Sequence, residues 1–266
     1  LARGNPGLQD RLFSLSLEAP AAADQALAAM EHYLAGQGQM PDQETVRIFL
    51  ENLALEGALS LLRPGERELL RLSTLFEMPA PLAVLDHLAA AFALDAGEPC
   101  GYRLSGLGLW DVYADLVQPA EPAAALNALA RPLTGELADH EMRAAAAEAL
   151  PVLFGRWGEL ESDRRPYPAD YELARLAVLA DRPLGLAVTA TPALYWLNEQ
   201  LRNRDAAELG RRAVDCLDRH QQPPPFALLR AAGEACVRVG ETSSARDCYR
   251  RALDRLEDSQ GETVAL

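Results

Sequence analysis

The sequence contains no lysine. All 25 basic side chains among its 266 residues are arginine, against 39 acidic ones, which gives a net charge of −14. Without lysine, this chain excludes enzymes that form a lysine Schiff base and phosphate-binding loops that end in lysine. The acidic excess also disfavours nucleic acid as a partner, because contacts between basic side chains and phosphates dominate that affinity.

Long apolar runs and paired cysteines are lacking too. No run approaches 18 apolar residues free of charge or proline, so we predict no transmembrane helix and no membrane partner. No signal peptide is visible, and the four cysteines show no CxxC spacing, which predicts reduced thiols and a cytoplasmic location. Because the chain starts at Leu1 in mid-pattern, without methionine, we expect it to be a fragment of a longer protein.

Helix-forming residues are abundant. Ala, Leu, Glu and Arg dominate, and apolar residues recur every three or four positions, which predicts a mostly α fold. Residues 1–62 are expected to form a small helical domain. A second helical domain is expected over 136–266, with helices at about 139–154, 169–181, 191–201, 205–219, 226–239 and 242–257.

The middle of the chain, residues 63–135, has a different pattern. Three short helices, at 66–76, 81–93 and around Leu104, precede two segments with β character at 109–117 and 124–130. Three short helices followed by a β-hairpin is the order of a winged helix. Between residues 61 and 135 there are five arginines against nine acidic residues, and the third helix offers no base-reading side chain. This domain is therefore expected not to bind DNA.

The last two predicted helices carry the pattern of a tetratricopeptide repeat. Gly233 and Ala245 are small enough for two helices to approach closely, Gly240 suits the turn, and Tyr249 can fill the space beside them. The segments 191–201 and 205–219 look like a degenerate second repeat. We expect an α-α superhelix whose surface binds a protein or peptide partner; an unrelated helical hairpin is the alternative.

Patterns for catalysis or metal binding are missing. The histidines His32, His87, His140 and His220 show no ligand spacing, and HExxH is absent. Ser105 lacks the preceding glycine of a nucleophile elbow. We therefore predict no enzyme, no catalytic residue and no metal.

Arginines on the last helices are the candidate partner-binding residues. Arg246 and Arg250 lie at helical spacing, and Arg211 and Arg212 lie on an earlier helix. They are predicted to contact an acidic partner; the alternative is a solvated face of ion pairs with neighbouring acids.

The start of the chain, Gly4-Asn5-Pro6 followed by a leucine-rich helix, resembles the GxP motif of STAND-type signalling ATPases. The order of a small helical domain, a winged helix and helical repeats is similar to the C-terminal part of that family. The resemblance implies that Pro6 packs against the adenine of ATP or ADP in the parent protein, and that the parent forms oligomers. It also implies a non-catalytic sensor fragment of a signalling protein, with no cofactor of its own. The absence of lysine and the bias toward Ala, Arg and Leu indicate a GC-rich, bacterial genome.

The chain departs from that family at a second motif, Met-His-Asp, near the end of the winged helix. In the stretch 126–131, Asn127 stands where the histidine would be, and Ala128 replaces the aspartate. Phosphate sensing by this domain is therefore in question. A winged-helix transcription regulator and a plain tetratricopeptide scaffold without a nucleotide link are the alternative functions.

Overall fold

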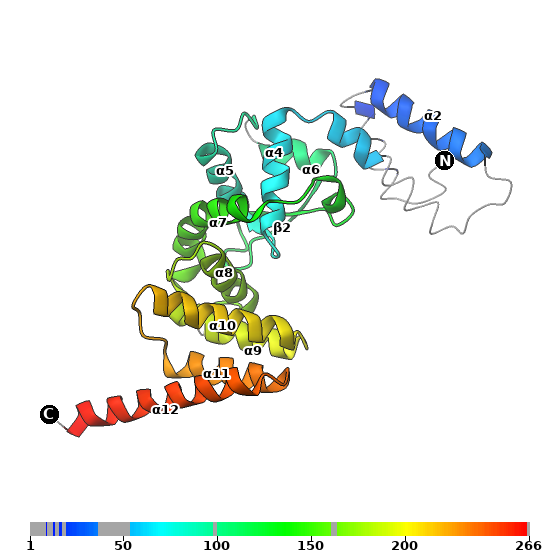
Figure 1. The fold of residues 1–266 in the computed structure, drawn as a ribbon. Coiled ribbons are helices and arrows are strands. Elements are labelled where there is room, and N and C mark those ends of the chain that lie inside the picture. Colours follow the sequence, from blue (N-terminus) through cyan, green and yellow to red (C-terminus); the bar gives the residue numbers. More distant parts are fainter. Residues whose placement is uncertain are drawn as a thin grey trace. The chain divides into compact units, whose positions relative to one another are not determined.

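The computed structural model describes residues 20–36, 54–97, 100–160 and 164–264, together with the isolated positions 9, 13, 16 and 17. The chain divides into two compact units (Figure 1). The N-terminal unit comprises Leu1–Asp115 and Ala120–Leu137, and the C-terminal unit comprises Leu116–Pro119 and Ala138–Leu266. The expectation of a mostly α fold is confirmed, with one small antiparallel sheet. The division into three domains stays a prediction.

The N-terminal unit combines helices with three short strands. In chain order the described elements are α2 (Pro20–Gly36), a helical segment over 54–60, α4 (Pro64–Leu72), the 3-10 turn η1 (Ser73–Leu75), β1 (Ala80–Pro81), α5 (Leu82–Ala91), α6 (Cys100–Gly106), β2 (Trp110–Ala114), β3 (Pro122–Leu126) and the 3-10 turn η2 (Arg131–Leu133).

The sheet has the order β1-β3-β2, and both pairings are antiparallel. Trp110 pairs with Leu126 at one end of the β2–β3 hairpin, and Ala114 pairs with Pro122 at the other. The hairpin was predicted, but its second strand ends at Leu126, because the backbone turns at Asn127 and Ala130 N donates to Asn127 O at 2.9 Å. Strand β1 was not predicted, because two residues are too short to show a period.

Buried polar contacts fix the helices of this unit around an apolar core. Glu66 on α4 is 2% exposed, and its carboxylate accepts bonds of 2.5 and 2.6 Å from Nη1 of Arg103 on α6. Nη2 of Arg103 also donates to the carbonyl of Leu61. The buried indole of Trp110 donates to Oγ of Ser73 at 3.1 Å. Because a buried charge needs a partner, Glu66 and Arg103 fix the position of α6 against α4.

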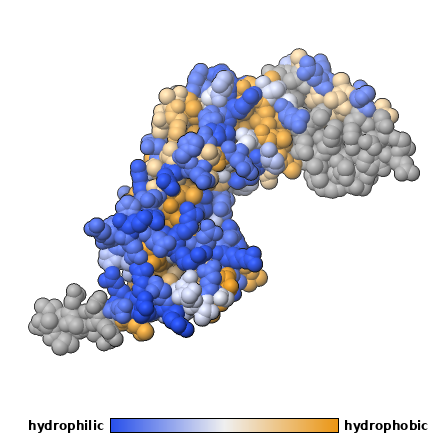
Figure 2. All heavy atoms as spheres, viewed as in Figure 1, coloured by the Kyte–Doolittle hydropathy of each residue, from blue (hydrophilic) through white to orange (hydrophobic). Residues whose placement is uncertain are grey.

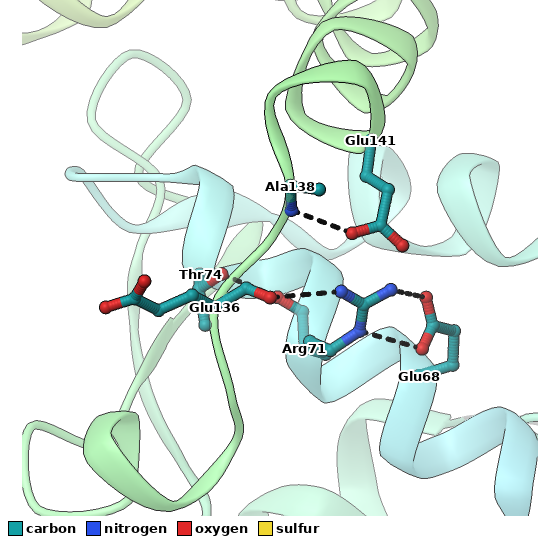
Figure 3. A network of polar contacts seen from close by, with 6 residues as sticks. All are labelled: Glu68, Arg71, Thr74, Glu136, Ala138 and Glu141. Atoms are coloured by element: carbon teal, nitrogen blue, oxygen red, sulfur yellow. Dashed lines mark hydrogen bonds and ion pairs between the residues drawn. The ribbon is translucent and has the colours of Figure 1, made fainter.

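Arg71 on α4 holds the segment that follows η2. Its guanidinium makes two hydrogen bonds of 3.0 and 2.7 Å to the carboxylate of Glu68, and Nη1 donates to the carbonyl oxygen of Glu136 at 3.3 Å (Figure 3). In the C-terminal unit, the carboxylate of Glu141 accepts a bond of 2.8 Å from the backbone N–H of Ala138. This bond satisfies a free donor just before the first helix of that unit.

The C-terminal unit is a series of helices. The described elements are α7 (Asp139–Leu153), the π-helical turn η3 (Phe154–Gly158), α8 (Tyr167–Leu179), α9 (Leu186–Glu199), α10 (Asn203–Arg219), α11 (Phe226–Arg238) and α12 (Thr242–Val264). Each helix packs on the next along the chain, and in addition α8 packs on α10 and α9 on α11. Successive helix pairs therefore stack on one another. No helix within the described ranges combines the length and the apolar character needed to cross a membrane.

Small residues set the spacing of these helices. A Cβ atom added to Gly233 on α11 would lie 2.9–3.1 Å from three ring atoms of Tyr249 on α12. Gly240 has φ +81° in the turn between the two helices. The predicted packing of Tyr249 beside Gly233 and the turn at Gly240 are confirmed. Gly210 on α10 gives a further close approach, since its added Cβ would lie 3.0 Å from the Cβ of Ala232.

An ion pair is buried at the start of α8. Nε of Arg165 lies 2.5 Å from Oδ1 of Asp170, and the two side chains are 1% and 0% exposed. The guanidinium also donates to the carbonyls of Gly158 and Leu160. Burial raises the pKa of Asp170 from 3.8 to about 6, although the hydrogen bond from Arg165 opposes the change.

The raised pKa of Asp170 predicts a pH dependence of stability. Because the folded pKa lies above the unfolded one, the native state holds the proton more tightly, and this contribution to stability is lost as pH rises from about 4 to above 6. We expect the free energy of unfolding of the wild type, relative to Asp170→Asn, to fall by up to about 3 kcal/mol over that range. Urea denaturation of both proteins at several pH values checks this; an equal pH dependence would contradict it.

Candidate interaction surface

A groove between α10 and α12 contains two of the predicted partner-binding residues, Arg211 and Arg212. Its volume is about 550 Å³, and it is open to solvent. Helix α10 is amphipathic: Ala206 and Ala213 are buried against other helices, so its charged residues face outward. The groove is lined by Glu208, Arg211, Arg212, Val214, Asp215, Ser243, Ser244, Asp247, Cys248 and Arg251.

The arginines of the groove form ion pairs with neighbouring acids. Arg211 lies 3.3 Å from Glu241, and Arg212 lies 3.5 Å from Glu208. Arg251 donates to both carboxylate oxygens of Asp218 at 2.7 and 2.8 Å. In the Arg211–Glu241 pair, Oε2 of Glu241 is buried. The Arg212–Glu208 pair is exposed to solvent on both sides, and exposed pairs contribute about 0–1 kcal/mol each. An incoming carboxylate can therefore replace Glu208 at little cost.

Two of the four predicted arginines, Arg211 and Arg212, line the groove. Arg250 lies at its border, because it forms a 2.6 Å ion pair with Asp247 of the lining. Arg246 is exposed, lies outside the lining and forms no ion pair with any residue that the structure describes. Pro6, the predicted nucleotide contact, lies outside the described residues.

A second exposed surface, on α9 and α11, was not indicated by the sequence. Nη2 of Arg230 donates to the hydroxyl oxygen of Tyr195 at 2.6 Å, which joins the two helices. Val188 lies two turns before Tyr195, and Val237 lies two turns after Arg230; they are 53% and 58% exposed. The packing of α9 on α11 brings these side chains together, and no local sequence pattern indicated this.

The structure also brings together three metal-ligating side chains for which no site was predicted. Asp181 follows α8, and Cys216 and His220 lie at the end of α10. The spacing of four residues between Cys216 and His220 puts both on one helix face, and this signal was overlooked. Asp181 is 35 residues before Cys216, so no local pattern could indicate it.

Asn127 has a structural role in the turn after β3. Its Nδ2 donates to Oδ1 of Asp111 on the neighbouring strand at 3.3 Å, and its Oδ1 accepts from the backbone N–H of Leu129 at 3.0 Å. Asn127 is 7% exposed. Both ends of its amide group are therefore used within the N-terminal unit.

Hydrophilic residues predominate on the face of the C-terminal unit that Figure 2 shows. No protein-family model, curated protein or solved structure matches the chain.

Proposed function

We propose that this chain is a non-catalytic, protein-binding part of a signalling ATPase of the STAND type. In this proposal the N-terminal unit contains a winged helix, and the C-terminal unit is a tetratricopeptide-like superhelix that binds an acidic protein or peptide. Nucleotide binding, ATP hydrolysis and oligomer formation belong to the parent protein.

The winged-helix assignment is supported by the order of the elements. Helix α4, strand β1, helices α5 and α6 and the β2–β3 hairpin follow one another, and β3 lies between β1 and β2 in the sheet. The repeat assignment is supported by stacked helix pairs with Gly233 beside Tyr249 and with a positive φ at Gly240.

A protein partner is favoured over DNA by the bonding of α6. In a winged helix this third helix would read the bases, and Arg103 is its only arginine. Arg103 is bound to the buried carboxylate of Glu66 and to the carbonyl of Leu61. Releasing it for a base contact would leave Glu66 buried and unpaired, which is costly.

The observation that carries the proposed partner class is the groove between α10 and α12. It gathers Arg211, Arg212 and Arg251 from two helices in an open groove of about 550 Å³. Glu208, the acid that pairs with Arg212, is exposed, so a carboxylate of an acidic segment can exchange with it. The bidentate geometry of guanidinium groups suits carboxylates.

We expect a labelled short poly-glutamate peptide to bind the chain at low salt despite its net charge of −14. Because the peptide carboxylates would contact Arg211 and Arg212, the double reversal Arg211→Glu/Arg212→Glu should weaken binding at least about tenfold. Fluorescence anisotropy at two salt concentrations measures this. Arg230→Glu/Arg238→Glu, a double reversal at two exposed arginines of α11 outside the groove, is the charge-matched control and should bind as the wild type does. Absence of binding, or equal binding by the double variant, would rule out this groove.

Sequencing the gene upstream of the codon for Leu1 tests whether the chain is linked to a nucleotide switch. If the chain is part of a STAND-type ATPase, the sequence encoded upstream of Leu1 should contain a Gly-x-x-x-x-Gly-Lys-Ser/Thr loop. An upstream region without that loop would leave the plain scaffold as the function.

A further inference from the structure

Three metal-ligating side chains converge at the junction of the α8–α9 turn and the end of α10. One ligand atom from each of Asp181, Cys216 and His220 lies within 4.8 Å of the others. Nε2 of His220 is 3.9 Å from Oδ1 of Asp181 and 2.8 Å from the Asp181 backbone carbonyl oxygen. Cys216 is fully buried, whereas the side chains of Asp181 and His220 are 41% and 39% exposed. The cluster is thus closed on the thiol side and open to solvent on the other.

The backbone geometry brings the side chains of Asp181, Cys216 and His220 together. Helix α8 ends at Leu179, and Asp181 has φ +51°, so the chain reverses there and turns the carboxyl toward α10. Cys216 and His220 lie one turn apart, at the C-terminal end of α10. Two helices therefore end at this cluster, and the negative ends of their dipoles favour a cation between them.

We propose that Asp181, Cys216 and His220 form a Zn²⁺ site. A thiolate sulfur, an imidazole nitrogen and a carboxylate oxygen are the ligand types that Zn²⁺ takes in proteins. The mixed set excludes Mg²⁺ and Ca²⁺, which prefer oxygen ligands throughout. Three protein ligands with an open side leave the fourth tetrahedral position to water. Bond lengths of about 2.0–2.3 Å require the ligand atoms to move somewhat closer than 4.8 Å on binding.

Two existing contacts compete with a metal: the 2.8 Å hydrogen bond that Nε2–H of His220 donates to the Asp181 carbonyl oxygen, and the ion pair between Asp181 and Arg219. Nε and Nη2 of Arg219 lie 3.2 and 2.6 Å from Oδ1 of Asp181. This ion pair holds the carboxylate of Asp181 beside Cys216 and His220. The side chain of Arg219 is 57% exposed and can swing into solvent when a cation replaces it. Cys216 loses its proton to solvent on binding, because the thiolate is the ligand.

Such a site would connect the turn after α8 to the end of α10, and so one helix pair to the next. Binding to the native state alone stabilises it by mass action, so zinc would stiffen this part of the helical series. This role is independent of the proposed partner groove, which uses other side chains of α10 and α12.

The full chain, reduced and freed of metal, is titrated with Zn²⁺ by calorimetry and with Co²⁺ by absorption spectroscopy. We expect one ion to bind per chain, a thiolate-to-cobalt charge-transfer band in the near ultraviolet, and a Tm about 5 °C or more higher at saturating Zn²⁺. Cys216→Ser should abolish the band. Since Cys216 is buried and its replacement can disturb folding, the exposed substitutions Asp181→Asn and His220→Gln provide independent tests and should weaken Zn²⁺ binding at least about 10- to 100-fold.

Two further variants separate this site from adventitious binding to thiols. Cys236→Ser, at another buried cysteine of the same unit, is the matched control and should retain full affinity and the charge-transfer band. Arg219→Ala should bind Zn²⁺ more tightly, because it removes the competing cation. Absence of saturable Zn²⁺ binding by the wild type, or unchanged affinity in both His220→Gln and Asp181→Asn, would overturn the proposal.

Discussion

Arg165→Met is expected to lower the free energy of unfolding by about 3–5 kcal/mol at neutral pH. The substitution leaves the carboxyl of Asp170 with 0% exposure and without its cationic partner. It also removes the donors to the carbonyls of Gly158 and Leu160. Asp170, whose pKa is already raised to about 6, would take up a proton more readily, so the loss should be smaller at pH 5 than at pH 8.

The double variant Arg165→Met/Asp170→Leu is the control for this experiment. Replacing both members of a buried ion pair by apolar residues of similar volume is often neutral or stabilising, so the double variant should recover most of the lost stability. Urea denaturation gives the free energies, and native-state hydrogen exchange in α7 and α8 localises the change. A loss below about 1 kcal/mol in the single variant would show that Arg165 contributes little to this unit.

Gly233→Leu is expected to lower the free energy of unfolding by about 2–3 kcal/mol, because overpacking displaces neighbouring side chains. A Cβ added at this position would lie 2.9 Å from the ring of Tyr249, and a leucine side chain is larger still. The higher helix propensity of leucine offsets less than about 1 kcal/mol of this loss. Alanine is a poor test here, since its propensity gain and its steric cost are of similar size.

A compensating substitution separates steric conflict from other effects. Gly233→Leu/Tyr249→Ala restores space between α11 and α12, and should be more stable than the sum of the two single changes predicts. Thermal denaturation followed by circular dichroism compares the four proteins. Additive losses would mean that the leucine and the ring do not meet.

Much of the helical fold could be predicted from local pattern. The segment 139–154 was predicted as a helix, and α7 spans Asp139–Leu153; the segment 226–239 corresponds to α11, Phe226–Arg238. Apolar and small residues at three- and four-residue spacings determine which face of each helix is buried. The start of α9 was predicted at 191 but lies at Leu186, because Gly185, with φ +70°, ends the preceding turn earlier.

The candidate sites were predictable only in part. Arg211 and Arg212 could be chosen from the sequence because they are adjacent on one helix, but Ser243 and Arg251 enter the groove from α12. The sequence analysis gave ion pairs with neighbouring acids as the alternative to partner binding, but it did not identify which acids pair with which arginines. The pairing of Arg251 with Asp218 spans 33 residues, and no local period encodes it.

The sequence by itself determined the helical class of the chain, the small residues at its helix contacts and the acidic balance that disfavours nucleic acid. Tertiary structure alone decided that Arg165 and Asp170 are buried together, that Arg230 on α11 reaches Tyr195 on α9, and that Asp181 meets Cys216 and His220. The physical reason is the sequence separation over which each property is determined. Helix periodicity is a property of neighbouring residues, whereas burial and ligand geometry depend on how whole helices stack, to which every residue of each interface contributes.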